Sequence, residues 1–140
     1  MIVSGKIPFV LDKLFTGEEI GTWIFSGDKA ISRRKFWLAY NLDPAGRIKV
    51  DEGAAIALRQ GGKSLLPAGI VDVEGGFGVG TLVRIVDAAG ANVGVGLSNY
   101  KASELKKIMG RKSSEIERIL GHCLFQEVVH RDNLLLDPAL

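Results

Sequence analysis

The stretch RIKVDEGAAIALRQGGKSLLPAGIVDVEG, residues 47–75, carries the strongest signals for the fold. RIKVD alternates polar and apolar side chains, which predicts a strand. Asp51 suits the N-cap of a helix over GAAIALRQ, and the Gly61–Gly62 pair predicts where that helix ends. SLLPAGIVDVEG predicts one or two further strands around Pro67. From residue 47 onward, strands are therefore expected to alternate with short helices.

The same alternation of predicted strands and short helices continues toward the C-terminus. TLVRIVD and ANVGVGLSNY predict two strands joined by the turn AAG. Ser103 and Ser114 suit helix N-caps, the latter in a capping box with Glu117. FQEVVHRDNLLLD predicts extended chain. Residues 47–136 are therefore predicted to form a small, mostly antiparallel β barrel or sandwich decorated by short helices.

Residues 1–25 follow a different pattern. MIVSG predicts a buried strand, and IPFVLDKLFTG a helix with Pro8 at its first position and Gly17 just past its end. GTWIF, residues 21–25, predicts a second strand. A strand–helix–strand unit needs a parallel sheet to join, and nothing later in the chain repeats the pattern. We interpret it as the end of an α/β domain, followed by a linker with a short helix over 26–46, and expect its unpaired strand edge to favour dimerisation.

Bulk composition limits the class of protein. The 140 residues are 46% hydrophobic and 24% charged, typical of one soluble globular domain plus a fragment. A single cysteine, Cys123, cannot form an internal disulfide and fits a reducing compartment. No apolar run approaches the roughly 20 residues of a membrane span, and no signal peptide is evident. These observations predict a cytoplasmic protein with no membrane partner.

Charge gives a weak indication of nucleic-acid binding. The formal net charge is only +2, low for a protein that neutralises phosphates. Eight basic residues nevertheless lie between Lys29 and Lys63, against three acidic ones. A solvated mixed surface is the simpler interpretation of this segment.

Two glycine-rich stretches resemble nucleotide loops but have the wrong context. In ALRQGGKS, residues 57–64, Ala57 replaces the first glycine, and the helix precedes the loop instead of following it. In GGFGVG, residues 75–80, the glycines precede the β-branched run TLVRIVD, whereas a dinucleotide loop needs a helix there. Both are predicted to be turns.

The stretch HRDN, residues 130–133, resembles a kinase catalytic loop. Asn133 follows Asp132 directly, however, whereas a kinase places this metal-binding Asn several residues later. His130 is therefore predicted to be a structural hydrogen-bonding group, and Asp132 an ion-pair or cap residue. The adjacent pair His122 and Cys123 lacks the spacing of a metal site. We predict no catalytic residue, no metal site and no cofactor for the chain itself.

These stretches together resemble the C-terminal portion of the bacterial glutamate 5-kinase (gamma-glutamyl kinase) family. VSGKIPFVLDKLFTGEEIGTWIF is similar to the end of its amino-acid-kinase domain, which accounts for residues 1–25. GGKSLLPAGI, RKSSEIERILG and HRDN are similar to its PUA domain. The resemblance implies an α+β, mostly β fold: a PUA-like pseudo-barrel of mixed and antiparallel strands over 47–136, with a C-terminal extension from about residue 113, preceded by a β-α-β remnant of the kinase domain.

The resemblance also implies a function. The full-length enzyme would transfer the γ-phosphate of ATP to the side-chain carboxylate of glutamate with magnesium, the first step of proline biosynthesis. Its substrate-binding residues would lie upstream, so this chain would be a non-catalytic, accessory or regulatory domain packed against the rest of the kinase domain and other subunits. The alternative is a module that binds structured RNA through its first helix and adjacent strand edges, with Lys49, Arg59 and Lys63 contacting phosphates. A third hypothesis is a free-standing RNA-modification cofactor protein, which requires Met1 to be a natural start.

Overall fold

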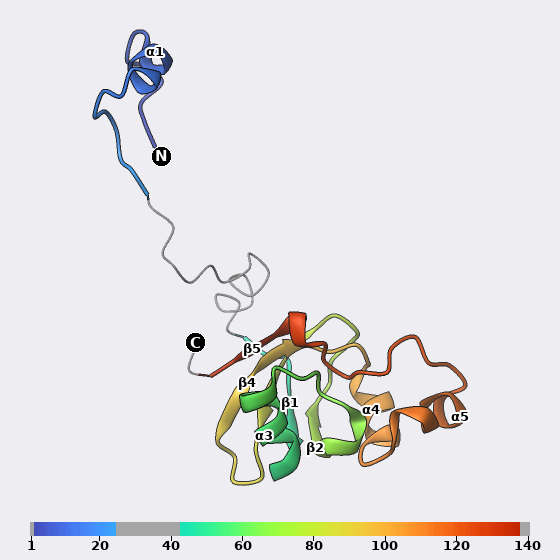
Figure 1. Ribbon diagram of the computed structural model, residues 1–140. Helices are drawn as coiled ribbons and strands as arrows, with labels where there is room; N and C mark the ends of the chain where they lie inside the picture. Colours follow the sequence, from blue (N-terminus) through green and yellow to red (C-terminus); the bar gives the residue numbers. More distant parts are fainter. Residues whose placement is uncertain (1, 25–42, 138–140) are drawn as a thin grey trace. The chain divides into compact units, whose positions relative to one another are not determined.

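The computed structural model describes residues 2–24 and 43–137 (Figure 1). The chain divides into two units between Ile31 and Ser32, inside the expected linker. The short helix expected within 26–46 lies outside the described residues. So does a basic group at the start of the linker, namely Lys29, Arg33, Arg34 and Lys35.

Within residues 2–24, the first unit contains one helix and one bridge. Helix α1 spans Val10–Phe15, as expected, but it begins after Pro8 because Phe9 adopts a left-handed conformation with φ of 56°. The backbones of Ile2 and Thr22 exchange two hydrogen bonds of 2.8 and 2.7 Å in an isolated antiparallel bridge. The two predicted strands thus meet in one antiparallel bridge, whereas a strand–helix–strand unit was expected to join a parallel sheet. The chain folds back on itself, so its two ends run in opposite directions and pair antiparallel.

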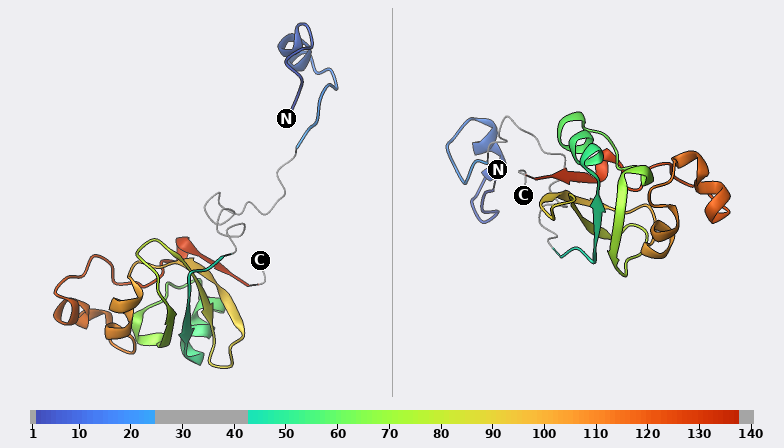
Figure 2. Two further views of the ribbon diagram at one scale, coloured as in Figure 1. Left: turned by 180° about the vertical axis from the view of Figure 1, so that it is seen from behind. Right: turned by 90° about the horizontal axis from the view of Figure 1, so that it is seen from below.

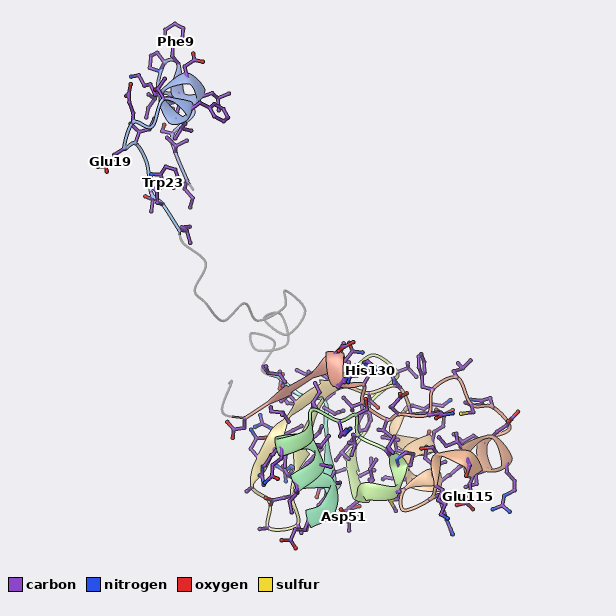
Figure 3. All side chains as sticks on the ribbon, viewed as in Figure 1. Phe9, Glu19, Trp23, Asp51, Glu115 and His130 are labelled. Carbon is purple, nitrogen blue, oxygen red and sulfur yellow. The ribbon has the colours of Figure 1, made fainter. Side chains whose placement is uncertain are left out.

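This first unit buries none of its described side chains. Phe15 is 90% exposed and Phe9 77%, and Phe9 projects away from α1 in Figure 3. The apolar stripe of α1 therefore forms no core with residues 2–24.

The second unit is built on a mixed five-stranded sheet in the order β2-β1-β3-β4-β5. The strands are β1 (Gly46–Val50), β2 (Ile70–Gly75), β3 (Leu82–Val86), β4 (Asn92–Leu97) and β5 (Leu134–Leu136). β1 and β3 run parallel, and the other neighbours are antiparallel. The α+β, mostly β class predicted from the sequence is confirmed.

Short helices and turns surround this sheet. They are α3 (Glu52–Gly61), α4 (Ala102–Ile108), α5 (Ile116–Leu120) and the 3₁₀ turns η1 (Pro67–Gly69), η2 (Ser113–Glu115) and η3 (Arg131–Asn133). Two views place β1 and β2 between α3 on one side and α4 and α5 on the other (Figures 1 and 2). One core joins them: it contains Ile48 and Ile85 from the sheet, Leu58 from α3, Leu105 from α4 and Ile116 from α5.

Helix α3 begins and ends as the sequence predicts. The Asp51 carboxylate accepts a hydrogen bond from the Ala54 N–H at 2.7 Å, which satisfies a donor that the helix leaves free. Gly62 ends the helix in a left-handed conformation with φ of 53°, which glycine adopts without strain.

The caps predicted at Ser103 and Ser114 are wrong. Ser103 lies inside α4, whose N-cap is Lys101, and Ser114 lies inside η2. A glutamate three residues past each true N-cap accepts the backbone N–H of that cap: Glu104 from Lys101 at 3.4 Å, and Glu115 from Lys112 at 3.1 Å. These carboxylates, not the serine hydroxyls, therefore mark where the turns begin.

Asp87 organises the tight turn between β3 and β4. Its carboxylate accepts the backbone N–H groups of Ala91 at 2.9 Å and Ala89 at 3.1 Å. It also accepts a hydrogen bond from the Arg59 guanidinium at 3.2 Å, which ties α3 to this turn. The hydrogen bond from Ala91, with further help from Arg59 and Ala89, lowers the pKa of Asp87 below its usual 3.8.

The Asp51 cap gives a first prediction. Replacing Asp51 with Ala removes the acceptor for the Ala54 N–H and should lower the free energy of unfolding by about 1 kcal/mol. Asp51→Asn keeps a side-chain oxygen acceptor and should stay close to wild type. Urea unfolding followed by circular dichroism measures both. An equal loss in the two variants would mean that the charge, and not the cap, stabilises α3.

The Asp87 turn gives a second prediction, on pH. Because the folded-state pKa is lowered, the unfolded chain binds the proton more readily. The stabilisation from this carboxylate is therefore complete above pH 3.8 and is lost as the pH falls through the folded-state pKa. Asp87→Asn should be less stable than wild type at pH 6, and the difference should shrink at pH 3. A constant difference in urea midpoint at both pH values would contradict the assignment.

Candidate functional site

A groove of about 540 Å³ lies along α3 and the loop that follows it. Most of its lining is small or apolar: Gly53, Ala54, Ala57, Leu58, Leu65, Leu66, Ala68 and Gly69. The polar lining consists of Asp51, Lys63, Ser64 and Glu127. The groove is thus an apolar slot whose rim carries one cation and two carboxylates. Slots of this volume suit a small ligand or an inserted side chain.

The C-terminal segment completes this groove. The backbones of Leu65 and Val129 form an antiparallel bridge, and Leu65 N–H donates to the Val129 carbonyl at 2.8 Å. The Arg131 N–H donates to the Ser64 hydroxyl at 3.1 Å. These bonds place Glu127 at the rim. Sequence reasoning missed Glu127, and no motif marks it, because only the non-local pairing with Leu65 brings it there.

The three predicted phosphate contacts do not form one surface. Lys63 lines the groove and is exposed. Arg59 lies on α3, but its Nη2 is 3.2 Å from the Asp87 carboxylate and 3.2 Å from the Asn92 carbonyl, so its charge is already compensated. Lys49 lies between the fully buried Ile48 and Val50 on β1. Since successive side chains of a strand point to opposite faces, Lys49 lies on the outer face, away from the core that α3 covers.

The stretches that resemble nucleotide motifs form a helix end, a connection between two strands and a capped turn. Gly61 and Gly62 end α3, and residues 75–80 connect β2 to β3. In HRDN, the Nδ1 atom of His130 accepts the Asp132 N–H at 3.2 Å and so caps η3 (Figure 3 labels His130). The structural role predicted for His130 is confirmed.

A hydrogen-bonded cluster joins α4 to the loop around Cys123. The hydroxyl of Tyr100 donates to the Phe125 carbonyl, and burial, together with the nearby Cys123, raises the pKa of Tyr100 to about 12. His122 Nε2 lies 3.3 Å from a Glu104 carboxylate oxygen. Tyr100 therefore stays neutral and anchors the loop. Across residues 2–24 and 43–137, no three His, Cys, Asp or Glu side chains gather in a way that could hold a metal ion.

No helix within the described part of the chain is long and apolar enough to cross a membrane.

Similarity to known proteins covers the whole chain. A glutamate 5-kinase from Maridesulfovibrio salexigens is 55% identical over 140 residues, which are 100% of this chain and 37% of that protein. A glutamate 5-kinase from Thermoanaerobacter pseudethanolicus is 47% identical over 136 residues, 97% of this chain and 37% of its own length. The chain thus spans 37% of the length of these relatives and corresponds to their C-terminal part. The resemblance to that kinase family is confirmed.

The family model named PUA domain matches residues 46–120, which include the sheet from β1 to β4 and the helices from α3 to α5. Among solved structures, a PUA domain from Aeropyrum pernix is 29% identical, with a TM-score of 0.46, over 61% of this chain and 41% of that one. The match to the family model covers more than half of the chain. The chain therefore belongs to the PUA domain family.

Proposed function

We propose that this chain acts as the C-terminal accessory domain of a glutamate 5-kinase and has no catalytic residue of its own. The observation that carries this proposal is the similarity over the full 140 residues to only 37% of a kinase. The whole protein would phosphorylate the side-chain carboxylate of L-glutamate at the expense of ATP and magnesium, the first step of proline biosynthesis. The ATP and glutamate sites would lie in the remaining part of the kinase.

The exposed apolar residues of 2–24 support this proposal. Phe9, Leu11 and Phe15 are each more than 60% exposed, and the unit buries no described side chain. Burying one such side chain contributes roughly 1.5–3 kcal/mol, so a segment that leaves all of them in water lacks most of its packing partners. The rest of an amino-acid-kinase domain, in the same polypeptide, would supply those partners. Other subunits of the kinase would be the further contacts of this domain.

RNA binding is the second candidate, and one observation favours it. The groove beside α3 carries the exposed Lys63, and no carboxylate pairs with that lysine among the described residues. The electrostatics oppose it: Asp51 and Glu127 share the rim, and Arg59 is paired with Asp87. A phosphate backbone would meet one free cation and two carboxylates, which disfavours binding by charge. The accessory role is therefore the better supported function.

The accessory role predicts the size and activity of the native protein. An antibody raised against this chain should detect, in the source cells, a polypeptide more than twice the 15.1 kDa of this chain. The 140-residue chain alone should release no ADP from ATP in a glutamate-dependent manner, because it holds neither substrate site. The full-length kinase is the positive control for that assay.

A native product of 15.1 kDa would contradict the accessory role and would favour a free-standing module. Glutamate-dependent ADP release by the chain alone would equally contradict it.

The RNA hypothesis predicts an asymmetry between two lysines. If the groove binds RNA, Lys63→Glu should weaken binding to a structured RNA by roughly fivefold or more, or about 1 kcal/mol, at ~50 mM salt. Lys49→Glu, on the outer face of the sheet, makes the same charge change and should leave affinity at the groove unchanged. Fluorescence anisotropy with a labelled hairpin measures both variants. The accessory role expects no saturable binding of any form of the chain.

A further inference from the structure

Two arginines lie side by side on the outer face of the sheet. The parallel pairing of β1 with β3 places Arg47 directly beside Arg84. Both arginines point away from the main core, because Ile48 and Ile85 beside them are fully buried. Around Arg84, this second face of the sheet carries a small apolar cluster of its own. Like charges on directly neighbouring strand positions destabilise a sheet. The fold therefore keeps an unfavourable pair.

Only one of these arginines has a partner. The Arg47 guanidinium lies 3.6 Å from a Glu74 carboxylate oxygen on β2. The Arg84 side chain makes no ion pair or hydrogen bond to any described residue, although it is half-buried in the middle of the sheet. Its nitrogen atoms remain accessible to water, because none of them is among the buried polar atoms that lack a partner in the described residues. Arg84 thus presents a guanidinium that is open to a ligand.

A hollow of about 380 Å³ lies beside the two guanidinium groups. Its lining contains two cations and two carboxylates, so its formal charges cancel. The lining residues are Asp43, Pro44, Ala45, Gly46, Arg47, Glu74, Gly75 and Arg84. The volume is within the range of small-molecule sites. The hollow thus offers separate partners for a negative and a positive group within one small space.

We propose that this hollow binds a small zwitterion, the class to which free α-amino acids belong. Arg84, together with Arg47, holds the carboxylate of the ligand in charge-assisted hydrogen bonds. Glu74 and Asp43 accept hydrogen bonds from its ammonium group. A plain anion or a simple amine would engage only one half of this lining, because the formal charges of the hollow cancel. This site goes beyond the proposed function, since it depends neither on the kinase nor on the groove beside α3.

The test is a titration of the 140-residue chain by NMR. The Nε–H signals of Arg47 and Arg84 and the backbone N–H signals of Gly46 and Gly75 are followed at constant ionic strength. The probes are the twenty standard amino acids, one at a time, with acetate and methylammonium as the two halves of the zwitterion. We expect at least one amino acid to shift all four signals saturably. Acetate and methylammonium should each bind at least about tenfold more weakly, because each engages only half of the site.

Two variants locate the binding. Arg84→Gln should weaken the binding of that amino acid by about tenfold or more, since it removes a charge-assisted hydrogen bond. Arg111→Gln is the control for the charge change, because Arg111 is exposed, has no partner among the described residues and lies outside the hollow. Arg84→Gln should also leave the urea midpoint unchanged or raise it, since it relieves the repulsion from Arg47.

Three results would overturn the proposal. One is that no amino acid shifts the four signals at concentrations up to the solubility limit. Another is that acetate binds as tightly as the amino acid, which would make the site a plain anion site. The third is that Arg84→Gln and Arg111→Gln weaken binding equally.

Discussion

The second unit depends on the close approach of the C-terminal segment to β4. Gly94 and Gly96 lie on β4 where β5 pairs with it. A side chain at Gly94 would collide with the carbonyl of Leu135, and one at Gly96 with the side chain of Val129. Only glycine lets the backbones come this near. Without these two positions, β5 could not add to the sheet, and the residues before it could not reach the core.

That closure explains why the C-terminal segment belongs to both the core and the groove. Val128 and Val129 are fully buried, and both pair with Leu65, which precedes η1. The same pairing carries Glu127 to the groove rim. The family match ends at residue 120, so the chain that closes the sheet lies beyond it. A truncation at that point would expose Leu65 and remove an edge strand, and the groove would lose one wall.

The bounds of α3 could be predicted from the sequence because the signals that set them are local. Features that depend on contacts between distant residues could not be predicted in this way. The Asp51 cap and the Gly62 stop act within four residues of the backbone they satisfy, so the sequence alone locates them. The partner of Arg59 is 28 residues away, and no local pattern announces it. Lys49 is a different case: its position between Ile48 and Val50 already predicts that it points away from the apolar face on which a helix would pack. Lys49, Arg59 and Lys63 are close in the sequence, but Lys49 does not lie on the same surface as Lys63.

The two units differ in what they bury and in what they expose. The second unit closes its own core, with buried residues from the sheet and from α3, α4 and α5. It places Lys63 in the groove and Lys49 on the opposite face of the sheet. A phosphate backbone follows a continuous basic surface, and these two lysines do not share one. The first unit, by contrast, forms no core of its own among residues 2–24, since its helix exposes the apolar side chains that a core would need. The proposed zwitterion site would use the second unit alone, whereas the exposed helix of the first unit is suited to packing against more protein. The proposed accessory role rests on the first of these units, because its apolar side chains need a core that residues 2–24 do not supply.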